Sequence, residues 1–382
     1  MHIMFIPSWY SNKENPVHGS FFKEQALALQ DKNIKITIAY NEILNLKKFY
    51  RFSKEKIGLI KSIEDGLKTY RYRNFNYLPK NSNMFYIFNK RMDRLYKKIV
   101  EDEGKIDLIH CQSSFWAGIS ASYISKKYGV PLIITEHSSL ERAIYIRESY
   151  KSFIKDSYLT AHKLIAVGNG LKKEMENFCG RKDIKVIHNM IDLDKFYLGN
   201  KTDKTFKFFS LAFLEGEKGM DILIKSFAKF FVNKDFKLLI GGEGSQLEYL
   251  KKLSNKLGIS NQVEFLGALS RENVAKNMSE CDCFVLASRY ETFGVVYIEA
   301  LASGKPVIGV YNGGAEEIIN DKNGIIVKKD SIEDLGNAMI YISNNIDSYN
   351  KEYIRKNCMD RFSKDKITNE IIALYKKVLD QN

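Results

Sequence analysis

Short apolar runs alternate with amphipathic segments along the whole chain of 382 residues. In the first half the apolar runs predict strands at Ile3–Pro7, Lys35–Ala39, Leu108–Cys111, Leu132–Thr135, Lys163–Val167 and Lys185–His188. Helical periodicity fills intervals between them, for example in Phe21–Gln30 and Ala117–Lys127. This alternation is typical of a parallel sheet wrapped by helices.

The same alternation restarts in the second half. The predicted strands there are Phe206–Leu211, Lys237–Ile240, Gln262–Phe265, Cys283–Leu286, Pro306–Val310 and Gly324–Val327, and the predicted helices include Asp221–Phe231, Gln246–Leu257, Glu272–Ser279 and Val295–Ser303. A chain of this length exceeds what one hydrophobic core usually supports. We therefore predict an α/β protein of two Rossmann-like, doubly wound domains that face each other across a cleft.

The domain boundary is expected near residues 189–200, where a polar stretch separates the two patterns. We assign residues 1–190 to the N-terminal domain and residues 191–362 to the C-terminal domain. Residues 41–105 have no clear assignment and are compatible with an extra helical excursion or a long loop.

Positive charge is concentrated in the first half. The net charge is +13, and residues 1–190 hold 32 Lys and Arg against 19 Asp and Glu, whereas residues 191–382 hold 27 of each. The segment Lys47–Lys98 alone has 15 basic and 4 acidic residues, interleaved with aromatic residues. This pattern predicts contact with an anionic membrane surface. The alternatives are a solvated basic surface and a single-stranded nucleic-acid site, but no recognisable nucleic-acid-binding module accompanies the charge.

The cysteines and the first residues indicate a cytoplasmic protein. Five cysteines, an odd number, lack the paired CxxC spacing of a zinc site. Cys281 and Cys283 fit small core residues, with a ligand or redox pair as the alternative. The start of the chain, Met1–Pro7, fits a buried strand better than a signal peptide, and no apolar run approaches the length of a membrane span.

Candidate chemistry is concentrated in residues 288–308, which follow a predicted strand and open a helix. Gly294 lies where the chain turns into that helix, so nearby backbone N–H groups are free to hold a diphosphate. Glu299 interrupts an apolar run about a turn and a half into the helix, where a carboxylate can accept hydrogen bonds from a ribose diol. Glu291, before the helix, would lie near a sugar. The alternative is that both glutamates are solvated charges.

These residues resemble the retaining glycosyltransferases of the GT-B fold, specifically family four in its bacterial surface-polysaccharide form. Its hallmark is two glutamates separated by seven residues before a Gly-Lys-Pro strand start, here Glu291, Glu299 and residues 304–306. Similar motifs extend over nearly the whole chain: Pro7–Tyr10, Asn15–Gln25, Thr135–Ser139, Ile187–Asp192, Gly241–Gly244 and Val263–Gly267.

The resemblance implies a site. Catalytic roles fall to His137, which would contact the transferred sugar, to Lys218, which would neutralise the leaving diphosphate, and to Glu291. The donor-binding set is Gly19, Lys218, Leu266, Glu291, Phe293, Gly294, Val295 and Glu299. For His137 the alternative is a histidine that merely caps a strand end. The last helix, in residues 363–382, is expected to pack back on the first domain.

The implied reaction moves a sugar, with retention, from a nucleotide-sugar (a UDP-sugar) to a saccharide or lipid-linked acceptor in surface glycan assembly. The acceptor would bind the N-terminal domain, at the inner face of the plasma membrane. No cofactor and no metal are expected; the spacing Asp192-Leu193-Asp194 is an alternative metal pair, although it falls in the interdomain link.

One position departs from the family pattern. Members commonly carry an arginine five residues before the lysine, and here that position is Phe213. Lys218, the helix start and an arginine from elsewhere, such as Arg289, would then stabilise the diphosphate. A nucleotide-sugar epimerase of similar architecture and a non-catalytic donor-binding protein are the competing functions.

Overall fold

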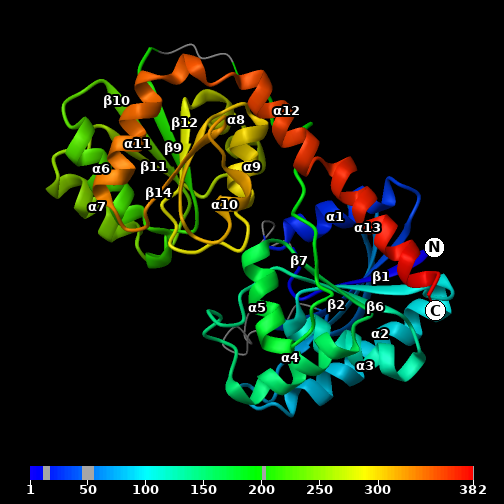
Figure 1. Cartoon of the computed structure of the whole chain (residues 1–382). Coiled ribbons are helices and arrows are strands. Elements are labelled where there is room, and N and C mark those ends of the chain that lie inside the picture. Colours follow the sequence, from blue (N-terminus) through cyan, green and yellow to red (C-terminus); the bar gives the residue numbers. More distant parts are fainter. Residues whose placement is uncertain (12–17, 45–55, 200–203, 382) are drawn as a thin grey trace. The chain divides into compact units, whose positions relative to one another are not determined.

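The structure, a computed structural model, describes residues 1–11, 18–44, 56–199 and 204–381. It divides into two compact units, one formed by Met1–Ile187 with Ile367–Asn382 and the other by His188–Lys366 (Figure 1). The first boundary therefore lies at 187/188, whereas the sequence placed it at 190/191. The chain returns to the first unit at Ile367, within the final helix α13 (Lys364–Leu379).

The first unit is built on an eight-stranded sheet in the order β3-β4-β2-β1-β5-β6-β7-β8. Its strands are β1 (His2–Pro7), β2 (Lys35–Leu44), β3 (Gly58–Glu64), β4 (Leu67–Phe75), β5 (Leu108–Gln112), β6 (Leu132–Glu136), β7 (Lys163–Ala166) and β8 (Lys185–Val186). Neighbouring strands are parallel except β3 and β4. The predicted strands are confirmed, with ends that differ by a few residues.

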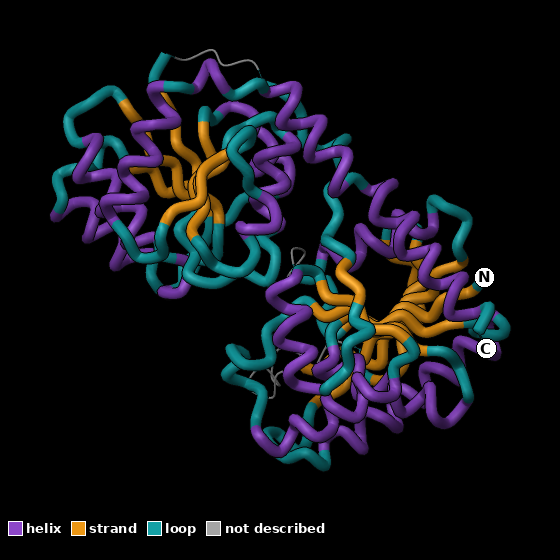
Figure 2. Tube along the Cα trace, in the orientation of Figure 1, coloured by secondary structure: helices purple, strands orange, loops and turns teal. Residues whose placement is uncertain are grey.

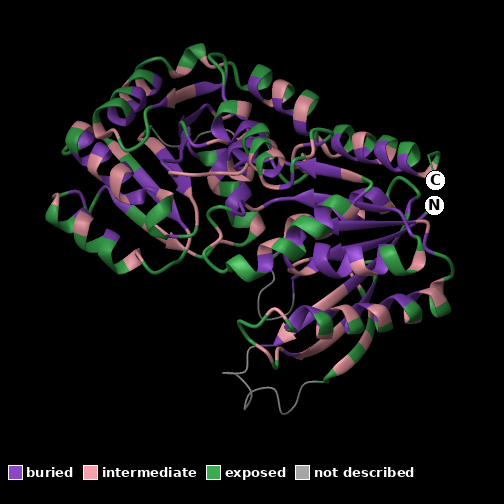
Figure 3. Ribbon diagram, turned by 60° about the horizontal axis from the view of Figure 1, so that its bottom comes forward, coloured by how far each residue is buried: buried purple, intermediate pink, exposed green. Residues whose placement is uncertain are grey.

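Helices cover this sheet and keep its central strands away from water (Figures 1 and 2). They are α1 (Ser20–Gln30), α2 (Met84–Glu103), α3 (Ile119–Tyr128), α4 (Glu148–Thr160), α5 (Asn169–Cys179) and the end of the chain in α13. Every residue of β1, β5 and β6 is buried, as expected for parallel strands covered on both faces (Figure 3). A kinked turn, η2 (Ser114–Gly118), joins β5 to α3, and the backbone angles of Phe115 and Trp116 within it are not helical.

The unassigned region 41–105 contains a β-hairpin and a long helix. Strand β2 runs on to Leu44, β3 and β4 pair antiparallel, and α2 follows. The turn is Asp65-Gly66, with φ of 48° and 86°, the two-residue geometry that matches the twist of a hairpin. The described part of this region is thus neither a helical excursion alone nor a long loop. Its edge strand β3 was not predicted because its apolar pattern is weak.

The second unit has a fully parallel six-stranded sheet in the order β11-β10-β9-β12-β13-β14. Its strands are β9 (Phe206–Leu211), β10 (Phe236–Gly241), β11 (Val263–Gly267), β12 (Cys283–Val285), β13 (Val307–Val310) and β14 (Gly324–Val327). Its α-helices are α6 (Met220–Phe231), α7 (Leu247–Lys256), α8 (Arg271–Glu280), α9 (Val295–Ala302), α10 (Ala315–Ile318), α11 (Ile332–Asn344) and α12 (Lys351–Phe362), and its 3-10 turns are η3 (Gly216–Lys218) and η4 (Ile346–Ser348). Both units are thus Rossmann-like, as predicted.

Two further features concern the apolarity of the helices and the state of the cysteines. Among the described helices, none is long and apolar enough to cross a membrane. All five cysteines are free and buried. Burial raises the pKa of Cys281 to about 12 and raises that of Cys283 well above its usual range, so neither is a ready thiolate.

Candidate functional site

The loops at the carboxyl ends of β9, β12 and β13 form the candidate site of the second unit. Ligands of open parallel sheets bind beyond these strand ends. The loop after β9 ends in η3, and the loop after β12 leads into α9. The Glu291 N–H donates to the Asn312 carbonyl oxygen, 3.1 Å away, which ties the β12 loop to the loop after β13.

Two of the predicted catalytic residues meet here. The Lys218 Nζ lies 2.9 Å from Glu291 Oε1, and the two side chains are only 19% and 16% exposed. Lys218 ends η3, and Glu291 lies in the loop before α9. The structure therefore brings a cation and a carboxylate from distant parts of the sequence into one half-buried position.

Arg289 holds the segment that carries Lys218. The Arg289 N–H donates to the Glu217 carbonyl oxygen at 2.8 Å, and its Nη1 donates to the Gly216 carbonyl oxygen. Its Nε lies 2.7 Å from Asp330 Oδ1 and its Nη2 lies 3.3 Å from Asp221 Oδ1. Each guanidinium nitrogen is thus engaged within the protein. Arg289 is a brace for η3, whereas the sequence suggested it as a substitute cation for a diphosphate.

Gly219 makes this close packing possible. Its φ is 65°, and a Cβ there would lie 2.1 Å from the Ala287 carbonyl oxygen. A side chain at this position would push the Lys218 turn away from the β12 loop. Close packing therefore explains why a glycine follows Lys218.

The start of α9 is placed as the sequence predicted. Gly294 is its N-cap residue, with φ of 93°, and Val295 is the first helical residue. The backbone N–H groups of the first turn of a helix have no partner within the helix, and the helix dipole favours an anion there. The side chain of Phe293 is buried against His188 and Phe362. Only its backbone is left to contact a donor.

Glu299 is buried, and its partner is an arginine. Its side chain is 3% exposed, and Oε1 accepts from Nη1 of Arg271, the first residue of α8. The Arg271 guanidinium also lies over the Phe196 ring, 5.3 Å from its centroid. Neither glutamate is therefore a solvated charge, and Arg271 supplies a cation beside the buried carboxylate of Glu299.

A glycine-rich loop after β10 packs against the loop that carries Phe213. The Gly242 N–H donates to the Gly267 carbonyl oxygen at 2.8 Å, and a Cβ on Gly242 would lie 1.9 Å from the Ala212 carbonyl oxygen. Leu266, in β11, is partly exposed beside this loop. Phe213 is 73% exposed. Its ring thus lies at the surface where the family pattern has a cation.

In the first unit, His137 follows β6 and is buried. Its Nε2 lies 2.7 Å from Gln112 Oε1, and its ring contacts Phe21 and Phe22, with centroids 5.3 and 4.9 Å apart. Burial, with a smaller contribution from His110, lowers the pKa of His137 to about 3, so the ring is neutral at pH 7. The Nδ1 atom is buried and has no hydrogen-bond partner among the described residues.

Glu136, next to His137, was in the recognised motif but received no role. This carboxylate is 1% exposed and accepts from the Ser114 N–H and hydroxyl, the Tyr158 hydroxyl and the His137 and Ser138 N–H groups. Five donors satisfy a buried carboxylate without a cation. Glu136 thereby fixes the backbone that carries His137, a role visible only in the folded sheet.

Gly19 is the N-cap residue of α1, with φ of 73°. A Cβ there would lie 2.7 Å from the Trp9 carbonyl oxygen. This contact alone explains the glycine, and a donor contact is not needed for it. Residues 12–17 of the same motif lie outside the described residues.

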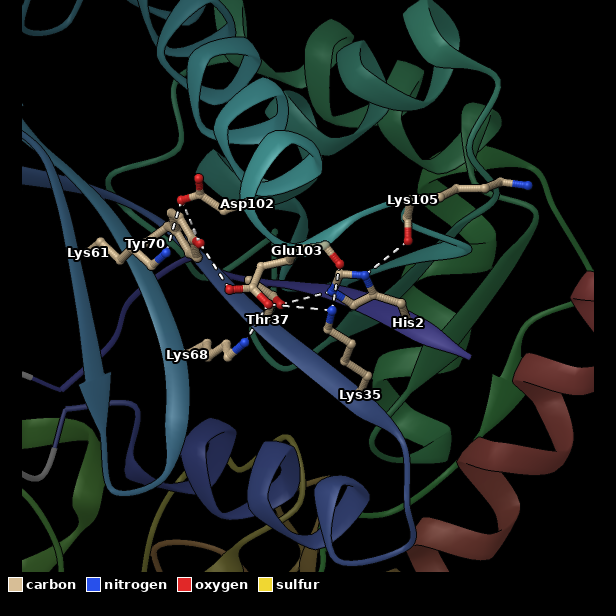
Figure 4. A network of polar contacts seen from close by, with 9 residues as sticks. All are labelled: His2, Lys35, Thr37, Lys61, Lys68, Tyr70, Asp102, Glu103 and Lys105. Atoms are coloured by element: carbon tan, nitrogen blue, oxygen red, sulfur yellow. Dashed lines mark hydrogen bonds and ion pairs between the residues drawn. The ribbon is translucent and has the colours of Figure 1, made fainter.

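Part of the basic segment forms ion pairs with acids just beyond it. Lys61 lies 3.0 Å from Asp102, and Lys68 lies 2.5 Å from Glu103 (Figure 4). Lys98 also pairs with Asp102. Hydrogen bonds from Lys98 and Lys61 lower the pKa of the Asp102 carboxyl group to about 2. The predicted window ended at Lys98, directly before these acids, so its charge count left out the negative charge of Asp102 and Glu103.

Two arginines of the hairpin are likewise paired. Arg71 lies 2.6 Å from Glu64, and Arg73 lies 2.9 Å from Glu42. Four further basic residues of the predicted membrane-binding segment, Lys47, Lys48, Arg51 and Lys54, lie outside the described residues.

The alternative metal pair does not form a cluster in the described structure. Asp192 Oδ1 accepts from the Asp194 N–H at 3.3 Å, and Asp192 lies 3.5 Å from Lys195 Nζ. Across the described ranges, no group of three or more His, Cys, Asp and Glu side chains is placed to hold a metal ion.

Comparison with known proteins relates both units to sugar-transfer enzymes. The model of Glycosyltransferase Family 4 matches residues 21–195, and that of Glycosyl transferases group 1 matches residues 191–357. An uncharacterised glycosyltransferase of Methanocaldococcus jannaschii is 31% identical over 326 residues, 83% of this chain and 88% of that protein. The alpha-monoglucosyldiacylglycerol synthase of Streptococcus pneumoniae is 26% identical over 66% of this chain and 63% of that protein.

Solved structures share the fold. The Anabaena protein HepE, solved in complex with UDP, has a TM-score of 0.75 at 19% identity, and the match covers 99% of this chain and 100% of that chain.

Proposed function

Because the chain belongs to the family-4 glycosyltransferases, we propose that it transfers a sugar from a UDP-sugar to a saccharide or lipid-linked acceptor in surface glycan assembly. The observation that carries the proposal is the contact between Lys218 and Glu291 beside the start of α9. A cation, a carboxylate and a helix N-terminus at the ends of adjacent strands suit a nucleotide diphosphate and its sugar.

Each residue has a proposed role. Lys218 and the N–H groups at Gly294 and Val295 offset the charge that develops on the departing diphosphate. Glu299 binds the ribose diol together with Arg271, and Leu266 offers backbone groups to the base. Glu291 lies near the transferred sugar.

The family resemblance assigns His137 of the first unit to the transferred sugar, and its ring is neutral because burial keeps its pKa near 3. In the reaction, the bond between the anomeric carbon and the phosphate oxygen breaks. A new bond forms to the acceptor oxygen, whose proton passes to the leaving diphosphate. Attack from the face that the phosphate leaves retains the anomeric configuration.

UDP as the nucleotide is supported by the HepE complex, and a lipid acceptor by the named product of the pneumococcal relative. We place the enzyme in the cytoplasm, at the inner face of the plasma membrane. The paired lysines of the hairpin support a smaller electrostatic contribution to membrane binding than the sequence indicated. Exposed aromatic rings of the same segment, Tyr77 and Tyr86, support an interfacial contribution.

Nucleotide release tests the function. The full chain is incubated with a panel of UDP- and GDP-sugars, with membrane extract as acceptor source and with EDTA. Acceptor-dependent release of UDP from one sugar, unaffected by EDTA, supports metal-free transfer. Conversion of the donor to its epimer without acceptor would identify an epimerase, and donor binding without release would identify a binding protein. If EDTA abolished nucleotide release, this would contradict the expectation that transfer needs no metal ion.

A further inference from the structure

We infer that Gln112 is a positioning residue that fixes the tautomer of His137, so that Nδ1 presents a lone pair to a substrate hydroxyl group. The inference rests on the proposed function for its consequence in turnover. Its structural part concerns only hydrogen bonds within the first unit, and it can be tested without any substrate.

A buried chain of hydrogen bonds leads from the C-terminal helix to His137. On β5, His110 and Gln112 are two residues apart and therefore point to the same face of the sheet. The Tyr375 hydroxyl of α13 lies 2.5 Å from His110 Nδ1, and Thr135 Oγ1 lies 2.8 Å from His110 Nε2. Gln112 continues the chain to His137 at 2.7 Å. His110 and Gln112 are both fully buried, so bulk solvent does not reach them.

The direction of each bond follows from the amide of Gln112. Its Nε2 donates to Gln25 Oε1 at 2.8 Å and faces His110 Nε2 at 3.2 Å. Its Oε1 is therefore the atom that faces His137 Nε2, and an amide oxygen only accepts. His137 Nε2 must then carry the proton. The same reasoning applies to His110. Its Nε2 accepts from the Gln112 amide, so its Nδ1 carries the proton and donates to the Tyr375 hydroxyl oxygen.

A neutral imidazole with a proton on Nε2 has a bare lone pair on Nδ1. That atom is buried and has no hydrogen-bond partner among the described residues. A buried polar atom without a partner costs free energy, which a donor hydroxyl on a bound ligand would recover. The burial that lowers the pKa of both histidines to about 3 also keeps them neutral. The chain thus shapes His137 as a hydrogen-bond acceptor and excludes it as a general acid.

The first test is spectroscopic. The full-length protein is labelled with ¹⁵N in its histidine rings, and the His137 signals are assigned with a His137→Gln variant. Wild type should show a protonated Nε2 and an unprotonated Nδ1. The opposite tautomer, or a charged ring at pH 7, would overturn the inference, whether or not any sugar is transferred.

Variants then separate positioning from general packing. Gln112→Leu should let the Nδ1–H tautomer appear and lower kcat/KM about tenfold, the worth of one hydrogen bond. Gln25→Leu, which frees the Gln112 amide to turn, should give the same tautomer change more weakly. An unchanged tautomer in both variants would refute the inference.

Thr37→Val is the matched control. It removes a different histidine hydrogen bond of the same sheet, the 2.9 Å contact between His2 Nε2 and the Thr37 hydroxyl (Figure 4). It should cost similar stability, yet leave the His137 tautomer and kcat/KM unchanged. A tautomer change in Thr37→Val as large as that in Gln112→Leu would show that the effect is not specific to Gln112 and would overturn the inference.

Discussion

Lys218 and Glu291 are separated by 73 positions in the sequence, yet the ammonium nitrogen of the first lies 2.9 Å from a carboxylate oxygen of the second. In the proposed function Lys218 binds the donor diphosphate, which would compete with Glu291 for the same ammonium group. Donor binding should therefore loosen this ion pair and release Glu291 toward the sugar.

Glu291→Gln tests this competition. The amide keeps the size of the side chain but removes the charge, so Lys218 becomes more available to the diphosphate. We expect donor affinity to rise by up to about fivefold, the worth of a partly exposed ion pair. Transfer should fall on the order of tenfold to a hundredfold, because the carboxylate near the sugar is lost. Isothermal titration with UDP-sugar and steady-state rates measure the two effects, and weaker donor binding would argue against the competition.

Arg289→Ala should loosen the η3 turn that presents Lys218. Its guanidinium contacts the Gly216 carbonyl oxygen, Asp221 and Asp330, so its loss removes a brace and leaves the chemistry intact. We expect kcat/KM to fall about tenfold, since misplacing a charged group by a small distance is costly. Unfolding stability should fall by only about 1–2 kcal/mol. Kinetics and urea unfolding check this, and unchanged kinetics with lost stability would assign Arg289 a purely structural role.

Gly219→Ala tests the close packing under Lys218, with Gly258→Ala as the control in the same unit. Both glycines have φ near 70°, but a Cβ on Gly258 meets nothing within 4 Å, whereas one on Gly219 meets the Ala287 carbonyl oxygen. Gly258→Ala should cost about 1 kcal/mol for its backbone alone. Gly219→Ala should cost about 1–3 kcal/mol more, because the turn must move. Equal losses in urea unfolding would show that the turn has room.

The buried histidines predict how stability depends on pH. The pKa values of His110 and His137 are lowered from 6.5 to about 3. Between pH 3 and pH 6.5, these two histidines are therefore protonated in the unfolded chain and neutral in the native state. Stability should therefore fall as pH drops below 6.5, by up to about 1.4 kcal/mol per pH unit for each histidine. Unfolding free energies at pH 7 and pH 5 measure this, and His137→Gln should remove the part of the slope that belongs to His137. A flat profile would contradict the neutral, buried state.

Much of the fold was predictable because parallel strands buried on both faces appear as continuous apolar runs. The edge hairpin was missed, although Asp65-Gly66 is a recognisable turn pair, because β3 alternates exposed and half-buried residues. The start of α9 was predictable from Gly294, since a local turn produces it.

The site was less predictable where it depends on distant partners. Nothing in the sequence links Arg271 to Glu299, Arg289 to the Lys218 turn, or Gln112 to His137, because these contacts form only when separate strands and helices assemble. The same holds for Lys61 and Lys68, whose partners Asp102 and Glu103 lie on α2. Charge counted along the chain therefore differs from charge at the surface.

The most direct test of the account compares UDP release by wild type, Lys218→Ala and Lys229→Ala, with acceptor and EDTA present. Lys229 pairs with Glu333 on the exposed face of α6 and is the matched control for loss of a lysine–glutamate pair. The account predicts acceptor-dependent release by wild type and Lys229→Ala, and a loss on the order of a hundredfold in Lys218→Ala. Equal release by Lys218→Ala and wild type would contradict the assignment of Lys218 to the departing diphosphate.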